Sequence, residues 1–189
     1  IEALHRSYLD AGSDIILTNT FGGSPIKLAM NGLDSDAIRI NQRAAEIARK
    51  AAEKYHAFVF GDVGPSGKLL TPMGDLTIDS LHDAYQMQIR ALDEGGVDAI
   101  LIETMSDLEE AKTAVRAAKS VTSLPVLVTF SFGSHGRTMM GLKPSTAATE
   151  LLQMDISMIG ANCGRTLSET LSAIREMKTA SPVKTWMAK

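Results

Sequence analysis

Several residues with the chemistry to contact a substrate or a metal stand directly after runs of apolar residues. They are Asn19 and Thr20, Asp62 and Gly64, Glu103, and Asn162 and Cys163. Each apolar run has the length and composition of a buried strand. In folds built on parallel strands, binding and catalytic groups gather at the carboxyl ends of the strands. These residues are therefore the first candidates for a functional site.

Glu103 is the carboxylate with the strongest case for a binding role. It follows the run VDAILI, so its side chain should be partly desolvated. A desolvated carboxylate needs a cation or hydrogen-bond donors. The ammonium group of a substrate would meet that need, and so would a structural ion pair with an arginine or a lysine.

The other strand ends have structural interpretations beside the functional ones. Thr18 and Thr20 could end a strand through side-chain hydrogen bonds. The GPSG segment that begins at Gly64 could be only a turn, although its backbone amides could also line a site. Asp62 could order a loop as readily as contact a ligand.

Cys163 is the single cysteine of the chain and a candidate metal ligand. A thiolate is a good ligand for zinc, which takes three or four protein ligands. Taken alone, however, a cysteine in a strand is more often a small buried apolar residue. The sequence has no CxxC or HExxH motif and its histidines are scattered, so any further ligands must come from elsewhere.

Predicted strands alternate with predicted helices along the chain. The strands are expected at 14–21, 58–63, 97–103, 125–130 and 156–163, with a sixth beginning near Val183. Apolar spacing of three and four predicts helices at 36–52, 78–94, 107–120 and 145–153, and another from Leu167. Capping-box spacings open two of these helices, at Ser106 and Glu109 and at Thr166 and Glu169.

The regular alternation of strands and helices predicts an α/β fold with a parallel sheet. A complete (β/α)8 TIM barrel needs about 250 residues. The 189 residues are therefore expected to form one domain, an incomplete barrel. An open doubly wound sheet is the alternative, but neither GxGxxG nor GxxxxGKS/T occurs, which disfavours its nucleotide-binding versions.

Composition and charge argue against several other classes of protein. The formal net charge is −3 and there is no block of lysines and arginines, so nucleic-acid binding gains no support. No apolar run approaches about eighteen residues, so no transmembrane helix and no membrane partner is expected. The single cysteine and the absence of a signal-peptide pattern favour a reducing, cytoplasmic setting.

Five segments carry a family resemblance when they are taken together. They are LTNTFGG at 17–23, FGDVGPSG at 60–67, ILIETMSDLEEAK at 100–112, GRTMMG at 136–141 and IGANCG at 159–164. In this order they resemble the homocysteine S-methyltransferase family, most closely the homocysteine-binding domain of cobalamin-dependent methionine synthases. The resemblance implies that 1–189 is part of a homocysteine-binding (β/α)8 barrel, from about the second strand to the start of the seventh, without the first strand and the C-terminal units.

The resemblance also implies a zinc site. The family binds Zn²⁺ through three cysteines, one in a G-x-N-C segment that Cys163 matches and two in a G-G-C-C segment that this chain lacks. Asn162, beside Cys163, would support the metal ligand. Coordination to zinc deprotonates a thiol, so the homocysteine sulfur would occupy the open position and attack a methyl group to give methionine.

Substrate contacts carry over at the matching positions. Glu103 corresponds to the acid that holds the amino group of homocysteine. Asn19 and Thr20 lie in the loop that binds the substrate in the family. Asp62 and Gly64 lie in the next loop, close to the same pocket.

The sequence does not identify the methyl donor. The resemblance favours methylcobalamin, recharged from methyltetrahydrofolate by additional folate- and cobalamin-binding domains or subunits, whereas other relatives use S-methylmethionine or betaine. Because two of the three cysteines are missing, the isolated chain is expected to bind zinc poorly and to be inactive. The alternatives are a barrel that only binds or assembles, and a Schiff-base aldolase, whose strand-end lysine has no counterpart because Lys68 and Lys143 are expected in loops.

Overall fold

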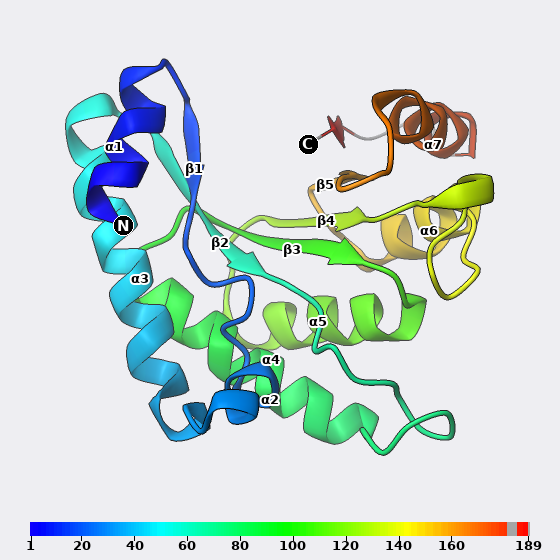
Figure 1. Ribbon diagram of the computed structural model, residues 1–189, viewed down its shortest axis with the longest axis horizontal. Coiled ribbons are helices and arrows are strands. Elements are labelled where there is room, and N and C mark those ends of the chain that lie inside the picture. Colours follow the sequence, from blue (N-terminus) through cyan, green and yellow to red (C-terminus); the bar gives the residue numbers. More distant parts are fainter. Residues whose placement is uncertain (181–184, 189) are drawn as a thin grey trace.

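Six parallel strands stand in one sheet in the same order as in the chain (Figure 1). The structure, a computed structural model, describes residues 1–180 and 185–188. The strands are β1 (Ile15–Leu17), β2 (Phe58–Val63), β3 (Ala99–Met105), β4 (Val126–Phe130), β5 (Met158–Ala161) and β6 (Thr185–Ala188). Each strand pairs in parallel with the next. Because β1 and β6 form the two edges of the sheet, the fold is the predicted incomplete barrel.

Helices separate the strands and cover the outer face of the sheet (Figure 1). They are α1 (Glu2–Asp10), α2 (Pro25–Leu28), α3 (Ala37–Ala52), α4 (Ile78–Glu94), α5 (Leu108–Val121), α6 (Pro144–Leu151) and α7 (Leu167–Ala180). Short 3-10 turns occupy Ala29–Asn31, Asp34–Asp36, Glu53–Tyr55, Ser134–Gly136 and Leu152–Met154. No helix in the described part of the chain is both long and apolar enough to cross a membrane.

Two strands end earlier than their predicted ranges do. The run 14–21 forms a strand only as far as Leu17, because the hydroxyl of Thr18 accepts a hydrogen bond from the backbone of β2 and the chain then turns. The run 156–163 is a strand only to Ala161, because Cys163 has a left-handed backbone with φ of 52°. The predicted start of the sixth strand, Val183, lies outside the described residues.

The two faces of the sheet bury different side chains. The large apolar core lies between the sheet and the outer helices. A smaller cluster, on the inner face, contains Leu101 and Leu127 with Leu17, Phe60 and Met158 packed against it. Because side chains alternate between the faces of a strand, residues two positions further along each strand also face inward. The inner face therefore changes from apolar to polar toward the carboxyl ends of the strands.

The start of α5 differs from the sequence-based prediction. The predicted cap was Ser106 with Glu109, but the cap is Asp107, whose carboxylate accepts a hydrogen bond of 2.9 Å from the backbone N–H of Glu110. The helix therefore begins one residue later, and the Glu110 side chain turns inward and is buried. For α7, Thr166 accepts from the backbone N–H of Glu169 at 3.2 Å, as predicted.

Candidate functional site

Four polar residues form the layer that ends the inner face of the sheet. They are Asp62, Glu103, Thr129 and Asn162, whose exposed fractions are 5%, 6%, 0% and 1%. Each lies two residues beyond an inward-facing position on its strand or, for Asn162, four beyond Met158. A buried polar side chain is costly unless it is hydrogen-bonded. We call these residues the polar layer, and it lies where a barrel enzyme places its site.

Asn162 connects Glu103, one of the two carboxylates of the polar layer, with Cys163. Its Nδ2 atom lies 3.4 Å from Glu103 Oε2, 2.7 Å from Thr104 Oγ1 and 3.5 Å from Cys163 Sγ. The Thr104 hydroxyl in turn points to Cys163 Sγ at 3.9 Å. The ends of β3 and β5 thus bring one carboxylate, one thiol and two donors into a single cluster.

Thr104 and Cys163 owe their positions to unusual backbone conformations. Each directly follows an inward-facing residue, so in a continuing strand each side chain would point toward the outer helices. Thr104 instead has φ of 61° and Cys163 has φ of 52°. Left-handed backbone is uncommon outside glycine, and rare for a β-branched residue. It turns both side chains toward Asn162, and it leaves Cys163 exposed at the mouth of the barrel.

A second cluster joins the ends of β1 and β2. Thr18 accepts from the backbone N–H of Asp62 at 2.9 Å, and Thr20 donates to the backbone oxygen of Asp62 at 2.7 Å. The two threonine hydroxyls are also hydrogen-bonded to each other. Thr20 is therefore buried and tied to the neighbouring strand, in agreement with the strand-ending role considered for these threonines.

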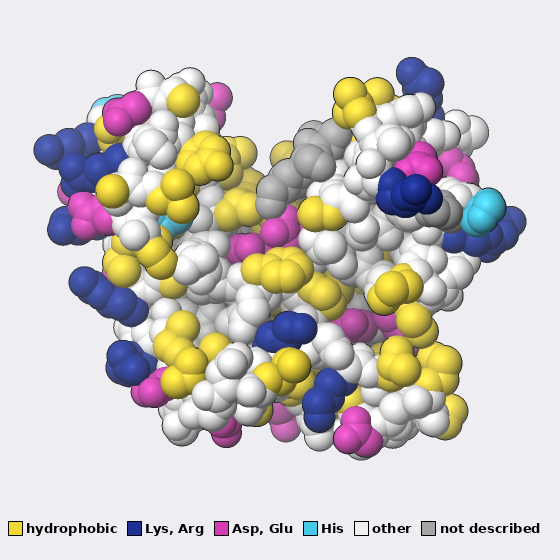
Figure 2. Space-filling model, in the orientation of Figure 1, with side chains coloured by type: hydrophobic (Ala, Val, Ile, Leu, Met, Phe, Trp, Pro, Cys, Tyr) yellow, Lys and Arg dark blue, Asp and Glu magenta, His cyan; other side chains and the backbone are white. Residues whose placement is uncertain are grey.

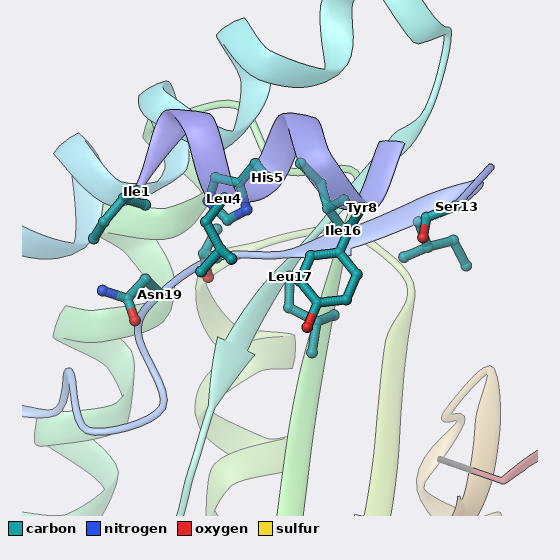
Figure 3. A pocket seen from close by; sticks show the side chains of 10 residues that line it. Ile1, Leu4, His5, Tyr8, Ser13, Ile16, Leu17 and Asn19 are labelled. Atoms are coloured by element: carbon teal, nitrogen blue, oxygen red, sulfur yellow. The ribbon is translucent and has the colours of Figure 1, made fainter. Parts of the chain in front are cut away.

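Asn19 lies apart from both clusters. It is exposed and stands at one end of a groove of about 540 Å³ between α1 and β1. Figure 3 shows Ile1 and the α1 residues Leu4, His5 and Tyr8 along this groove, opposite residues of β1. The surface is also hollowed between the part that contains α1 and the part that contains α7, on the side of the sheet away from α4 and α5 (Figure 2).

Gly64 allows the loops after β1 and β2 to touch. Its backbone N–H donates to the oxygen of Phe21 at 3.1 Å. A Cβ atom at position 64 would lie 2.5 Å from that oxygen and 2.6 Å from Phe21 Cδ2. No real Cβ contact is that short, so any other residue here must displace one of the two loops.

Gly64→Ala should therefore destabilise the protein by about 1–3 kcal/mol, the usual result of overpacking, because the loops must move apart. Thermal unfolding measures the loss of stability. Gly133→Ala is the matched control, because a Cβ atom there meets nothing within 4 Å. Equal unfolding temperatures for the two variants would show that the loops adapt freely.

The structure thus sorts the predicted residues into groups. Glu103, Asn162 and Cys163 come together at the ends of β3 and β5. Thr20 and Asp62 form a separate hydrogen-bonded pair at the ends of β1 and β2. The sequence did not single out Thr104 as a site residue, because a threonine after a strand residue gives no sign of a left-handed backbone. Within the described residues, no three His, Cys, Asp or Glu side chains are grouped closely enough to hold a metal ion. Cys163 can supply one exposed sulfur ligand to a metal.

The profile of a family described as homocysteine S-methyltransferase matches residues 1–188 of the chain. The methionine synthase of Mycobacterium leprae (strain TN) is 31% identical over 188 residues, which cover 94% of this chain and 15% of that protein. The metallated form of the homocysteine methyltransferase MmuM from Escherichia coli superposes with a TM-score of 0.84 at 20% identity, over 99% of this chain and 70% of that one. The dihydrodipicolinate synthase DapA-2 of Bacillus anthracis reaches a TM-score of 0.59 at 14% identity, over 99% and 55% of the two chains.

The two structural likenesses fall at low identity and establish the fold, a parallel (β/α) barrel of which this chain is a part. The chain spans only 15% and 16% of the two mycobacterial methionine synthases that it matches. The family profile, in contrast, covers the described strands and the site from end to end. The chain belongs to the homocysteine S-methyltransferase family.

Proposed function

We propose that the protein carrying this chain transfers a methyl group to homocysteine, with zinc held in part by Cys163 and the amino group of homocysteine held by Glu103. The observation that carries the proposal is the amide of Asn162, which contacts Glu103 and Cys163 at once. A ligand that has an ammonium group at one end and a sulfur at the other can therefore reach the carboxylate and a metal at the cysteine together. Homocysteine has these two groups.

Glu103 binds and orients the amino-acid end of the substrate. Its carboxylate is buried in the polar layer, where a charge-assisted hydrogen bond to an ammonium group is strong. Holding one end of homocysteine fixes where its sulfur lies, and such positioning can supply much of the rate enhancement of a transfer reaction.

Cys163 and its neighbours prepare the metal end of the site. The amide of Asn162 and the hydroxyl of Thr104 donate toward Cys163 Sγ and keep the sulfur aimed at the mouth. A soft thiolate suits zinc, and the family's adjacent cysteines would complete the ligand set from outside the described residues. Bound zinc would supply a Lewis acid that keeps the homocysteine thiol deprotonated at neutral pH.

The loops after β1 and β2 form the wall beside the amino-acid end. Asn19, exposed in its loop, contacts the substrate directly. Thr20 and Asp62 hold the two loops together, and Gly64 lets them approach each other. We assign these four residues to homocysteine binding, with the direct contact limited to Asn19.

The methyl donor is proposed to be methylcobalamin, regenerated from methyltetrahydrofolate on additional domains. The support is the match to methionine synthases of which this chain spans 15% and 16%. S-methylmethionine or betaine is the alternative donor. The E. coli homocysteine methyltransferase has the same fold, so the fold does not favour one donor over another.

The test is methionine formation by the full-length protein from homocysteine and each donor in turn. We expect zinc-dependent methionine formation, with methylcobalamin preferred, and no activity from residues 1–189 alone. A full-length protein that makes no methionine with any of the three donors would overturn the proposal and favour a barrel that only binds or assembles. Full activity of the isolated chain would overturn the proposal that Cys163 shares the zinc with cysteines outside these residues.

A further inference from the structure

The buried face of α4 carries two polar side chains among apolar ones. Tyr85 and Gln88 each have an exposed fraction of 0%, and they lie between Leu81, Ile89 and Leu92 on the side of the helix that packs on the sheet. The proposed roles of the site residues leave these two side chains unused. Burying a hydroxyl and an amide in an apolar layer is unfavourable unless both find partners.

The amide nitrogen of Gln88 finds its partners at the ends of β1 and β2. Its Nε2 atom donates to the backbone oxygen of Thr20 at 2.8 Å and lies 3.5 Å from that of Asp62. The Thr20 hydroxyl donates to the same Asp62 oxygen. A side chain from the outer helix layer thus ties together the two strand ends from which the substrate loops begin.

Tyr85 reaches the loop after β2 through a buried carboxylate. Glu110 of α5 accepts from the backbone N–H of Ser66 at 2.7 Å and from the Tyr85 hydroxyl at 2.9 Å. The Tyr85 hydroxyl also lies 3.4 Å from the backbone oxygen of Gly64. Burial, together with the neighbouring Glu110 carboxylate, raises the pKa of Tyr85 well above its ordinary value. The hydroxyl therefore remains a donor throughout the neutral range.

We propose that Gln88, Tyr85 and Glu110 form a brace that sets the positions of the loops after β1 and β2 and thereby the affinity of the site for the amino-acid end of homocysteine. This inference rests on the proposed function. The three are positioning residues, because they contact the backbone of the loops from the helix side of the sheet, opposite the inner face.

The brace acts on one side of the site only. Its contacts are to Thr20, Asp62, Gly64 and Ser66, all on β1, β2 and their loops. Cys163 lies after β5, on the other side of β3 and β4. Loosening the brace should therefore weaken homocysteine binding and leave zinc binding unchanged, a pattern that a general loss of folding would not produce.

The first experiment compares Gln88→Met with Gln86→Met in the zinc-loaded full-length protein. Gln86 is on the same helix but donates to Ser120, away from the loops, so its replacement should leave the KM unchanged. Gln88→Met keeps the size of the side chain and removes the hydrogen bonds. We expect the KM for homocysteine to rise between about 10-fold and 100-fold, the effect of a small misplacement near a site, with kcat and zinc content close to the parent values.

Glu110 provides a rescue test. Glu110→Gln retains an oxygen that can accept from Ser66 and Tyr85, so its KM should stay near that of the parent, whereas Glu110→Met should raise the KM. Hydrogen exchange at the Ser66 amide should be fast in Glu110→Met and slow in Glu110→Gln. If Glu110→Met fails to fold, Tyr85→Phe, which removes a single hydroxyl, takes its place and should raise the KM to a smaller extent.

The outcomes separate the brace from the proposed function. A parent protein that makes no methionine refutes the function, whereas the Ser66 exchange rates still decide whether the brace holds the loop. An active parent whose KM is the same for Gln88→Met and Gln86→Met, or for Glu110→Met and Glu110→Gln, overturns the brace. A KM that rises together with loss of zinc overturns it as well, because the effect is then not confined to one side of the site.

Discussion

Replacing Cys163 by serine should remove zinc from the full-length protein and abolish methionine formation. Removing a hydrogen-bonding partner of a metal ligand typically weakens metal binding by about 10- to 100-fold, so loss of a ligand itself should exceed that range. The thiol is exposed at the mouth and two donors are aimed at it, so the substitution changes the metal end of the site and little of the core. Zinc per chain after dialysis, together with the rate of methionine formation, measures the effect.

A matched pair of variants separates loss of a ligand from loss of the fold at this position. Aspartate and asparagine both tolerate the left-handed backbone that Cys163 adopts, and they are nearly the same size. Only aspartate offers an anionic oxygen that zinc accepts. Cys163→Asp should therefore retain part of the zinc and Cys163→Asn should not. Parent levels of zinc in Cys163→Asn would exclude Cys163 as a ligand.

Glu103→Gln should raise the KM for homocysteine by about 10-fold to 150-fold, because a hydrogen bond to a charged group is worth about 1.5–3 kcal/mol. The substitution keeps the shape of the side chain and its contact with Asn162, and removes the negative charge that an ammonium group requires. Zinc content should stay at the parent level. Steady-state kinetics and calorimetric titration with homocysteine provide the measurement.

Glu109→Gln is the control for this variant. Glu109 is on the exposed side of α5 and pairs with Lys112, so losing its charge should leave homocysteine binding unchanged. Unchanged affinity in Glu103→Gln would remove Glu103 from the role assigned here. In that case its burial would have to serve the structure, as the sequence alone had allowed.

The order of elements could be predicted from the sequence because each strand is a short apolar run and each helix has its own spacing. The run 58–63 is β2 without any change of bounds. Strand ends were harder to predict, since the predicted ranges extended into the polar residues that follow Leu17 and Ala161, where the backbone leaves the sheet. What stops these strands is a hydrogen bond from a distant residue or a left-handed backbone, and neither leaves a mark in the local sequence.

The site could be predicted in outline for the same reason. Strand ends of a parallel sheet share one edge, so Glu103 and Asn162 had to lie near each other once the fold was given. The role of Thr104 depends on its backbone angles, which the sequence does not show. The role of Glu110 depends on where α5 begins, and the sequence-based prediction placed the cap of that helix at the wrong residue. Gln88 left one usable signal, a polar residue three positions after Tyr85 on an otherwise apolar helix face.

The left-handed backbone at Thr104 also constrains how this protein can be improved. A β-branched residue in that conformation lowers stability by about 1–3 kcal/mol, which glycine at the same position would recover. A search for heat-resistant variants should therefore favour glycine at 104, and each such variant would lose the hydroxyl that points to Cys163. At position 104 the residue that raises thermal stability removes a contact of Cys163. A selection for heat resistance must therefore be accompanied by an assay of activity.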